Sequence, residues 1–253
     1  MNSQTTETVC GMTGLLPGIL RNWRRAGLVG APALPDGYTD AQLTHIYQIL
    51  NLTASGDALS EVRLRLNGYP APASGWEQRR NELHVQLDDP SSERLQDRIR
   101  QTGSDYCGDD FVNCYLRPLN LTLRRARRSD APSRQARFHN AVVRLAHSMI
   151  NASHRRHAVP VFLEAVSVDD ATEIWMEAIR LTGQGCRVEV CPNVTGYPAS
   201  ASEHHKHHLM WCGAGFSPLM KWNFRQKCRE DLPVMLCGPD QSLLADLVTD
   251  DMK

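Results

Sequence analysis

Residues 13–29 read Thr-Gly-Leu-Leu-Pro-Gly-Ile-Leu-Arg-Asn-Trp-Arg-Arg-Ala-Gly-Leu-Val, which predicts the end of one helix, a turn and a second helix. Leu20 and Trp23 are three residues apart and can share a buried face, whereas Asn22 and the arginines then face elsewhere. Gly27 follows the second helix, as a glycine past the last turn commonly does. A short helix, a tight turn and an arginine-bearing helix are typical of proteins that read the major groove of DNA. A plain helical hairpin would give the same pattern.

The composition is that of an ordinary soluble globular protein. The 253 residues allow one large domain or two to three small ones, and 42% of them are hydrophobic and 22% charged. The apolar runs are too short to span a bilayer, and the first residues lack the basic and apolar regions of a signal peptide. We therefore expect a cytoplasmic protein with no membrane partner. The eight cysteines lack metal-type spacing, so we expect buried, reduced thiols.

Charge is distributed unevenly, although the net charge of the chain is zero. Residues 1–68 hold as many basic as acidic side chains, residues 69–157 hold 15 arginines against 10 acids, and residues 158–253 hold 8 basic side chains against 13 acids. A DNA-binding segment is usually basic, because neutralising phosphates supplies much of its affinity. The neutral first segment therefore argues against a DNA-binding role.

The first two thirds of the chain show helical periodicity. After the turn-rich residues 30–38, apolar stripes predict helices at about 39–53 and 59–66, and the Pro/Gly-rich residues 68–75 predict a domain boundary. Four further helices, which pack naturally as a four-helix bundle, are predicted at residues 76–87, 91–102, 109–127 and 133–155. The arginine run 124–128 could bind phosphate, or it could be a solvated helix end favoured by the helix dipole.

The last third alternates strands with helices. Strands are predicted at residues 158–166, 186–191, 208–212 and 232–237, with helices at 171–181 and 217–229. Strand, helix and strand in this order imply a parallel sheet with a right-handed crossover. Ligands of such sheets bind outside the carboxyl ends of the strands, here at the loops 167–170, 192–197 and 213–216. The predicted fold class is α plus α/β, with three domains: a winged helix-turn-helix (1–68), a four-helix bundle (69–157) and a Rossmann-like βαβ domain (158–253).

Two clusters outside the first helices carry possible chemistry. Residues 203–208, Glu-His-His-Lys-His-His, could chelate a transition metal, but alternate histidines entering a strand diverge, so we predict no metal site. Asp169 and Asp170 could serve acid-base chemistry or bind a cation, or they could simply cap a helix. No Ser/His/Asp or Cys/His arrangement is supported, so we predict neither catalytic residues nor a cofactor, and no enzyme.

The order of these parts resembles that of the MerR-type transcription regulators. Residues 20–28, Leu-Arg-Asn-Trp-Arg-Arg-Ala-Gly-Leu, are similar to the second-helix signature of that family, and residues 56–66 look like its fourth helix. Further segments look like the bundle and C-terminal region of the MlrA/BluR branch; they are residues 75–76, 115–119, 174–177, 185–188 and 209–213. The resemblance spans about residues 3 to 238. That branch regulates curli and biofilm genes in enteric bacteria, so the resemblance implies DNA binding and targets among biofilm, curli or virulence genes.

The resemblance also implies which residues face DNA. They are Gly18, Ile19, Arg21, Asn22, Arg24, Arg25 and Tyr38. Arg21 would contact a phosphate, and Asn22 would lie near a base edge or the backbone. Residues 31–38 hold no arginine where the family's wing usually offers several, and Ile19 stands where relatives commonly have threonine. We therefore expect a weaker DNA affinity with a flatter salt dependence.

Partners follow from the same resemblance. It implies a homodimer on a two-fold promoter operator, controlled by a cyclic-di-GMP-related protein partner. The C-terminal region also resembles cobalamin-binding, light-sensing regulators, but Ala171 stands about where their cobalt-ligating histidine would be, so we expect a degenerate domain without cobalamin. Two alternatives stay open. One is an interaction protein with weakened DNA binding that modulates related regulators or their partners, and the other is a sensor of some other ligand.

Overall fold

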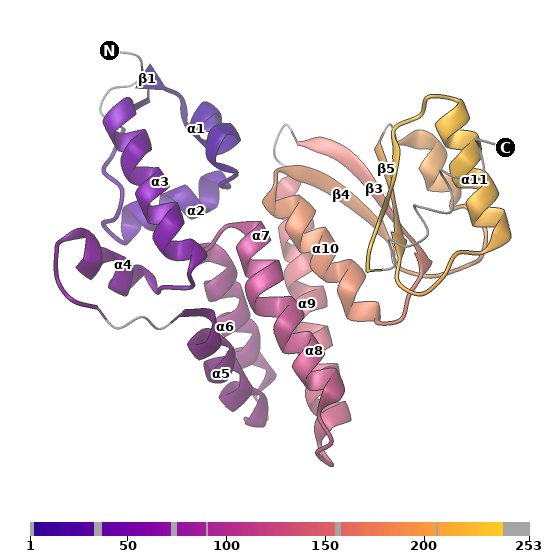
Figure 1. Cartoon of the computed structure of the whole chain (residues 1–253), viewed down its shortest axis with the longest axis horizontal. Coiled ribbons are helices and arrows are strands. Elements are labelled where there is room, and N and C mark those ends of the chain that lie inside the picture. Colours follow the sequence, from indigo (N-terminus) through magenta and orange to yellow (C-terminus); the bar gives the residue numbers. More distant parts are fainter. Residues whose placement is uncertain are drawn as a thin grey trace, which may run out of the picture. The chain divides into compact units, whose positions relative to one another are not determined.

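A computed structural model describes residues 3–32, 37–71, 75–89, 91–154, 158–205 and 207–239 (Figure 1). The chain forms two compact units, Met1–Leu145 and Ala146–Lys253. The three predicted domains, 1–68, 69–157 and 158–253, stay a prediction. In the described part, every helix is too short or too polar to cross a membrane.

The first unit begins with the expected helix, turn and helix. Helix α1 (Thr6–Thr13) ends at Gly14 in the left-handed conformation, and α2 (Pro17–Arg25) starts with a proline, whose missing N–H is no loss in a first turn. Gly27, with φ of +72°, ends α2 and allows the Leu28 N–H to donate to the Trp23 carbonyl at 2.9 Å. The prediction for residues 13–29 is confirmed at the level of secondary structure.

Two more helices complete this part of the unit. Helix α3 (Asp40–Ala54) begins at a capping box between Thr39 and Gln42, and α4 (Leu59–Leu66) follows a short turn. Strand β1 (Ser3–Gln4), which the sequence did not predict, pairs antiparallel with β2 (Tyr38–Thr39). The predicted wing falls partly on residues 33–36, outside the described residues, and stays a prediction. One core joins these elements; it contains Val9, Leu15, Ile19, Leu20, Trp23, Leu28, Val29, Tyr38, Ile46, Ile49 and Val62.

The predicted bundle helices are present, with one irregularity. They are α5 (Gly75–Asp88), α6 (Ser92–Asp105), α7 (Gly108–Asp110), η1 (Phe111–Leu116), α8 (Arg117–Arg125) and α9 (Ala131–Ser153). The segments α7, η1 and α8 run on without a break, so they form one helix with a π-helical turn in it. The last residues of α9, from Ala146 onward, belong to the second unit.

The second unit is a four-stranded parallel sheet in the order β4-β3-β5-β6. Its elements are β3 (Val159–Ser167), α10 (Ala171–Gly183), β4 (Cys186–Cys191), η2 (Ser200–His204), β5 (His207–Cys212), α11 (Pro218–Arg229) and β6 (Val234–Cys237). Helices α10 and α11 lie on opposite sides of the sheet (Figure 1). The connection from β4 to β5 carries the short 3₁₀ helix η2 among its described residues. The prediction of a parallel sheet is confirmed.

The cysteines are thiols, but most are not buried as predicted. Cys212 is buried and Cys228 is exposed, while the other six are partly exposed because they lie at helix surfaces or near strand ends. Burial still raises the pKa of Cys107 to about 12.

Candidate nucleic-acid interface

Helix α2 has a buried face and a cationic face. Leu20 and Trp23 are fully buried in the core of the first unit, whereas the side chains of Arg21, Arg24 and Arg25 are exposed. Within the described part of the chain, these three guanidinium groups make no ion pair. Exposed guanidinium groups can donate hydrogen bonds to phosphate oxygens, so this face is chemically suited to a nucleic-acid backbone.

The other residues singled out by the resemblance lie elsewhere. Ile19 and Tyr38 are only 4% and 1% exposed, so their side chains face the core, and Gly18 is half-buried in the first turn of α2. The Asn22 side chain donates to Asp105 Oδ1 at 2.5 Å. The structure thus brings the arginines of α2 onto one surface and directs Asn22 toward α6. The DNA-binding role of all seven residues stays a prediction.

Two adjacent residues of α2, Asn22 and Trp23, donate hydrogen bonds to Asp105 at the end of α6. Beside the Asn22 contact, the Trp23 indole Nε1–H donates to the Asp105 carbonyl at 2.8 Å. Burial raises the pKa of Asp105 to about 6, and the hydrogen bonds from Asn22 and Ser104 oppose this rise only in part. A carboxyl group with this pKa makes the contact between α2 and α6 sensitive to pH.

Asp105→Asn is expected to remove a pH dependence of stability. The pKa of Asp105 is about 6 in the folded protein and 3.8 is its ordinary value, so at intermediate pH the folded state binds more protons than the unfolded state. The contribution of Asp105 therefore falls as pH rises from about 4 to about 6, by about 1–2 kcal/mol once its partial exposure is allowed for. Urea unfolding of the wild type and the variant across this pH range measures the difference.

The matched control for this experiment is Asp97→Asn, whose carboxylate is 67% exposed and pairs with an exposed arginine. It should leave the pH profile of the unfolding free energy unchanged. If the profiles of the wild type and Asp105→Asn run parallel over the same range, the assigned role of Asp105 is wrong.

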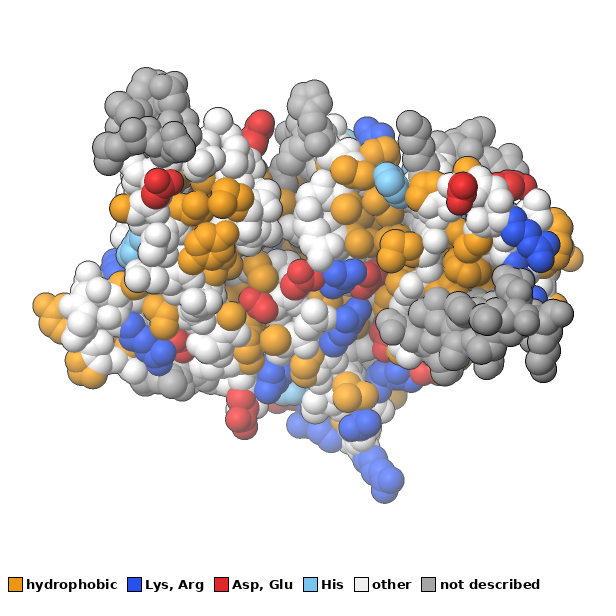
Figure 2. All heavy atoms as spheres, turned by 45° about the horizontal axis from the view of Figure 1, so that its top comes forward, with side chains coloured by type: hydrophobic (Ala, Val, Ile, Leu, Met, Phe, Trp, Pro, Cys, Tyr) orange, Lys and Arg blue, Asp and Glu red, His pale blue; other side chains and the backbone are white. Residues whose placement is uncertain are grey.

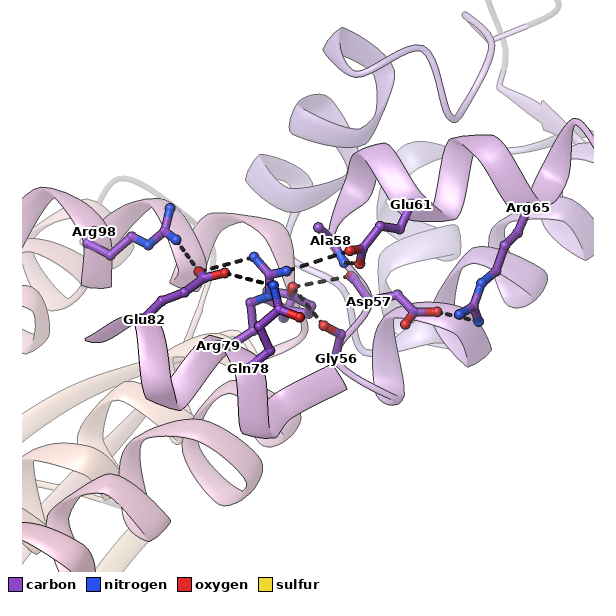
Figure 3. Close-up of polar contacts among 10 residues, drawn as sticks. Gly56, Asp57, Ala58, Glu61, Arg65, Gln78, Arg79, Glu82 and Arg98 are labelled. Carbon is purple, nitrogen blue, oxygen red and sulfur yellow. Dashed lines mark hydrogen bonds and ion pairs between the residues drawn. The ribbon is translucent and has the colours of Figure 1, made fainter. Parts of the chain in front are cut away.

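A network of ion pairs connects α4 with the bundle helices α5 and α6 (Figure 3). The Arg79 guanidinium lies between two carboxylates, 3.8 Å from Glu61 Oε1 and 3.2 Å from Glu82 Oε2, and Arg98 also pairs with Glu82. Glu61 in turn accepts the Ala58 N–H at 2.7 Å. Because Arg79 and Glu61 are largely buried, these contacts are less screened by water than surface ion pairs. The network therefore fixes α4 on α5 and α6.

Two aromatic residues of the bundle contact the segment between α3 and α4. The Trp76 indole N–H donates to the Ala54 carbonyl at 2.8 Å, and the Tyr106 hydroxyl donates to the Asp57 carbonyl at 3.2 Å. Their ring centroids are 4.5 Å apart. Gly56 has φ of +89°, and a Cβ there would lie 2.4 Å from the Trp76 backbone nitrogen, so only glycine allows this close approach. The helices at the start of the first unit are thus positioned by the bundle.

The arginine run 124–128 lies at the free end of α8, where Figure 2 shows Lys and Arg side chains gathered at the tip of the bundle. Arg128 pairs with Asp130 at 3.0 Å and Asp88 at 3.3 Å, and Arg124 and Arg125 occupy the last turn of α8. This placement favours a helix end stabilised by its dipole. Phosphate binding there stays untested.

Several residues of the loops and clusters predicted for the second unit have structural roles, and ligand binding at those loops stays a prediction. The loops after β3 and β5 touch, because the Gly213 N–H donates to the Ser167 carbonyl at 2.8 Å. Asp170 caps α10 by accepting the Thr172 N–H at 2.9 Å, which confirms the capping interpretation. His207 is exposed and His208 is buried, so they diverge as expected. Among the residues whose side chains are described, no group of three or more His, Cys, Asp or Glu could hold a metal ion.

Sequence reasoning missed a buried pair of a carboxylate and an imidazole in the sheet. His208 Nε2 lies 2.8 Å from Glu164 Oε2, and both side chains are only 3% exposed. Glu164 is the one charged residue in the apolar strand β3, and a lone carboxylate in a buried strand requires a partner. That signal could have indicated the pair, although it does not name His208.

Comparison with known proteins gives two results. Residues 159–227, from β3 to α11, match the family described as "Transcriptional regulator MlrA, C-terminal domain". Two curated relatives, from Salmonella typhimurium strains SL1344 and LT2, are both named "HTH-type transcriptional regulator MlrA". Each is 23% identical over 218 residues, which cover 83% of this chain and 88% of the relative. The chain is therefore similar to MlrA regulators over most of its length.

Proposed function

We propose that this chain is a DNA-binding transcription regulator of the MerR type that places α2 on DNA. The observation that carries the proposal is the cationic face of α2, formed by Arg21, Arg24 and Arg25 opposite a buried face. The names of the two relatives support it, since both are called HTH-type transcriptional regulators. No part of the proposal requires catalysis.

The finer features follow from the resemblance. The protein acts as a homodimer on a two-fold promoter operator and controls biofilm, curli or virulence genes. The second unit is a degenerate cobalamin-type domain that receives a signal from a protein partner related to cyclic-di-GMP metabolism. Ala171, in the first turn of α10, supplies no imidazole for cobalt, so no cobalamin is part of the proposal.

Backbone contact dominates over base reading in this proposal. Arginine side chains neutralise phosphates, which contributes affinity without sequence information. Asn22, the residue suited to read adenine, already donates to Asp105 in the protein. Sequence preference would therefore arise from few direct base contacts and from DNA shape.

Binding to DNA is expected to weaken when two arginines of α2 are removed. Genome-wide immunoprecipitation of the tagged protein supplies the DNA fragments, and fluorescence anisotropy at increasing salt measures their affinity. If Arg21 and Arg25 each neutralise one phosphate, Arg21→Ala with Arg25→Ala reduces the slope of log affinity against log salt by about 2 and the affinity about 50-fold at about 0.1 M salt.

The charge-matched control is Arg94→Ala with Arg100→Ala on α6, two side chains that are 76% and 66% exposed. It should leave both the affinity and the salt slope nearly unchanged. The proposal fails if no fragment is bound even at low salt, or if the α2 variant and the control weaken binding equally.

A second candidate function is favoured by two observations. Residues 1–68 have no net charge, and Asn22 is engaged by Asp105. An interaction protein with this architecture would bind DNA weakly and would modulate related regulators or their partners. Absence of any footprint, together with binding of the purified chain to a related regulator, would select this function.

A further inference from the structure

Strand β4 lies at the edge of the parallel sheet. In the strand order β4-β3-β5-β6, the described residues pair β4 with β3 alone. Its outer edge therefore presents backbone N–H and C=O groups that a further strand could use. Natural proteins usually protect such an edge, so the surroundings of β4 are informative.

A groove runs beside this edge. A cavity of about 540 Å³ is lined by the four successive residues 187–190 of β4. Successive residues of a strand point to opposite faces of the sheet, so a cavity that touches all four lies alongside the strand rather than above one face. The groove therefore exposes the hydrogen-bonding edge of β4.

The opposite wall comes from the end of α9. His147 and Ile150 of α9 and His154 just after it line the cavity at helical spacing, and Trp175 of α10 completes the wall. All these residues belong to the second unit. Because α9 faces β4 across the groove, a second whole sheet added to this edge would collide with α9. A single extended segment needs only the width of one strand, about 5 Å.

The two sides of the groove differ in chemistry. One side is apolar: Val190 and Ile150 are partly exposed there, and Val188 and Trp175 are buried beside them. The other side contains the exposed Arg187. The carboxylate of Glu189 on that side lies 3.3 Å from His205 Nε2, and the two form an ion pair when the imidazole is protonated, because Nδ1 already donates to the Ala201 carbonyl. Arg187 thus leaves a positive charge beside the edge, which favours acidic side chains on that face of an added strand.

We propose that the groove beside β4 binds an extended segment of a partner protein, with alternating apolar and acidic side chains, as an added strand of the sheet. Main-chain hydrogen bonds to β4 supply affinity, apolar side chains pack on the partly exposed Val190 and Ile150, and acidic side chains meet Arg187. The proposal concerns the second unit only and does not depend on DNA binding by α2.

The test uses the full chain and three capped synthetic peptides of defined sequence. The first alternates glutamate and valine, the second replaces each glutamate by lysine, and the third has the composition of the first with all valines before all glutamates. Calorimetry at about 0.1 M salt should give the alternating acidic peptide at least roughly tenfold higher affinity than either control peptide. Amide hydrogen exchange at residues 187–190 should slow when that peptide binds.

Variants of the protein sharpen the result. Arg187→Glu should weaken the acidic peptide at least roughly tenfold and make the lysine peptide the preferred ligand. Arg229→Glu, on the exposed side of α11, changes the net charge equally and should have no effect. Two outcomes would overturn the proposal: equal affinity for the alternating and block peptides, or binding without slower amide exchange in β4. Either one would mean that the peptide binds through its charge and not as an added strand. Failure of every peptide to bind would overturn it too.

Discussion

Trp23→Ala is expected to lower the free energy of unfolding of the first unit by about 3–5 kcal/mol. Trp23 is fully buried in the core that joins α1, α2, α3 and α4, so its truncation leaves a large cavity. The variant also removes the indole N–H that donates to the Asp105 carbonyl at 2.8 Å. Because the total stability of a domain is about 5–15 kcal/mol, a loss of this size unfolds much of the population on mild heating.

Calorimetry and urea unfolding of the full chain measure this effect. Trp23→Phe is the matched control, because it keeps most of the buried ring but removes the hydrogen bond, and it should cost about 1–2 kcal/mol. The transition of the second unit should stay unchanged in both variants. A loss below about 1 kcal/mol for Trp23→Ala would show that Trp23 does not anchor α2.

The local pattern around Trp23 was readable from the sequence, but its partner was not. The three-residue spacing of Leu20 and Trp23 predicted the buried face, because helix geometry follows from local chemistry. Asp105, which binds both Asn22 and Trp23, is 82 residues away from Trp23 in the chain. Periodicity within one helix contains no information about a contact at that separation, so the contacts of Asn22 and Trp23 with Asp105 could not be predicted.

Glu164→Ala is expected to cost the second unit about 3–5 kcal/mol, because it leaves buried polar groups without a partner. Glu164 accepts the Ala199 N–H at 2.6 Å and lies 2.8 Å from His208 Nε2. On the other side of the imidazole, Lys227 Nζ is 3.1 Å from His208 Nδ1. Nδ1 accepts from the ammonium group when the imidazole proton is on Nε2, which then faces the Glu164 carboxylate without a well-aligned hydrogen bond.

The conservative change Glu164→Gln should also be destabilising. A glutamine amide can keep only one of the two acceptor roles, and its NH₂ group can donate to His208 Nε2 only if the ring proton moves to Nδ1, where Lys227 already donates. Replacing the pair together, as Glu164→Leu with His208→Leu, should recover part of the loss, because an apolar pair leaves no buried carboxylate but the Ala199 N–H still loses its acceptor.

The exposed carboxylate of Glu189, which also faces a histidine, provides the matched control. It is 59% exposed, so Glu189→Ala should change the free energy of unfolding by less than about 0.5 kcal/mol. Urea unfolding of the full chain, followed by a probe of the second unit, gives these four values and those of the single variants Glu164→Leu and His208→Leu. Additive losses in the double variant would mean that Glu164 and His208 are not coupled.

The secondary structure of the second unit was predictable, and its irregular parts were not. Short apolar runs bounded by turns predicted all four strands, and their alternation with helices predicted parallel pairing. The π-helical turn at Phe111–Leu116 escaped prediction because one extra residue in a turn hardly disturbs a helical period. The groove beside β4 was also invisible, since it depends on where the end of α9 lies in space.

The double contact of Asn22 and Trp23 with Asp105 has a mechanical consequence. Two neighbouring residues of α2 hold the final residue of α6, so α2 cannot tilt or turn without α6. In a two-fold pair that occupies successive major grooves, about 34 Å apart, the distance between the two α2 helices would then be set by the bundles. If the chain forms the proposed two-fold pair on DNA, a signal that shifts α6 would change the half-site spacing that the pair can span, with the arginines of α2 left as they are.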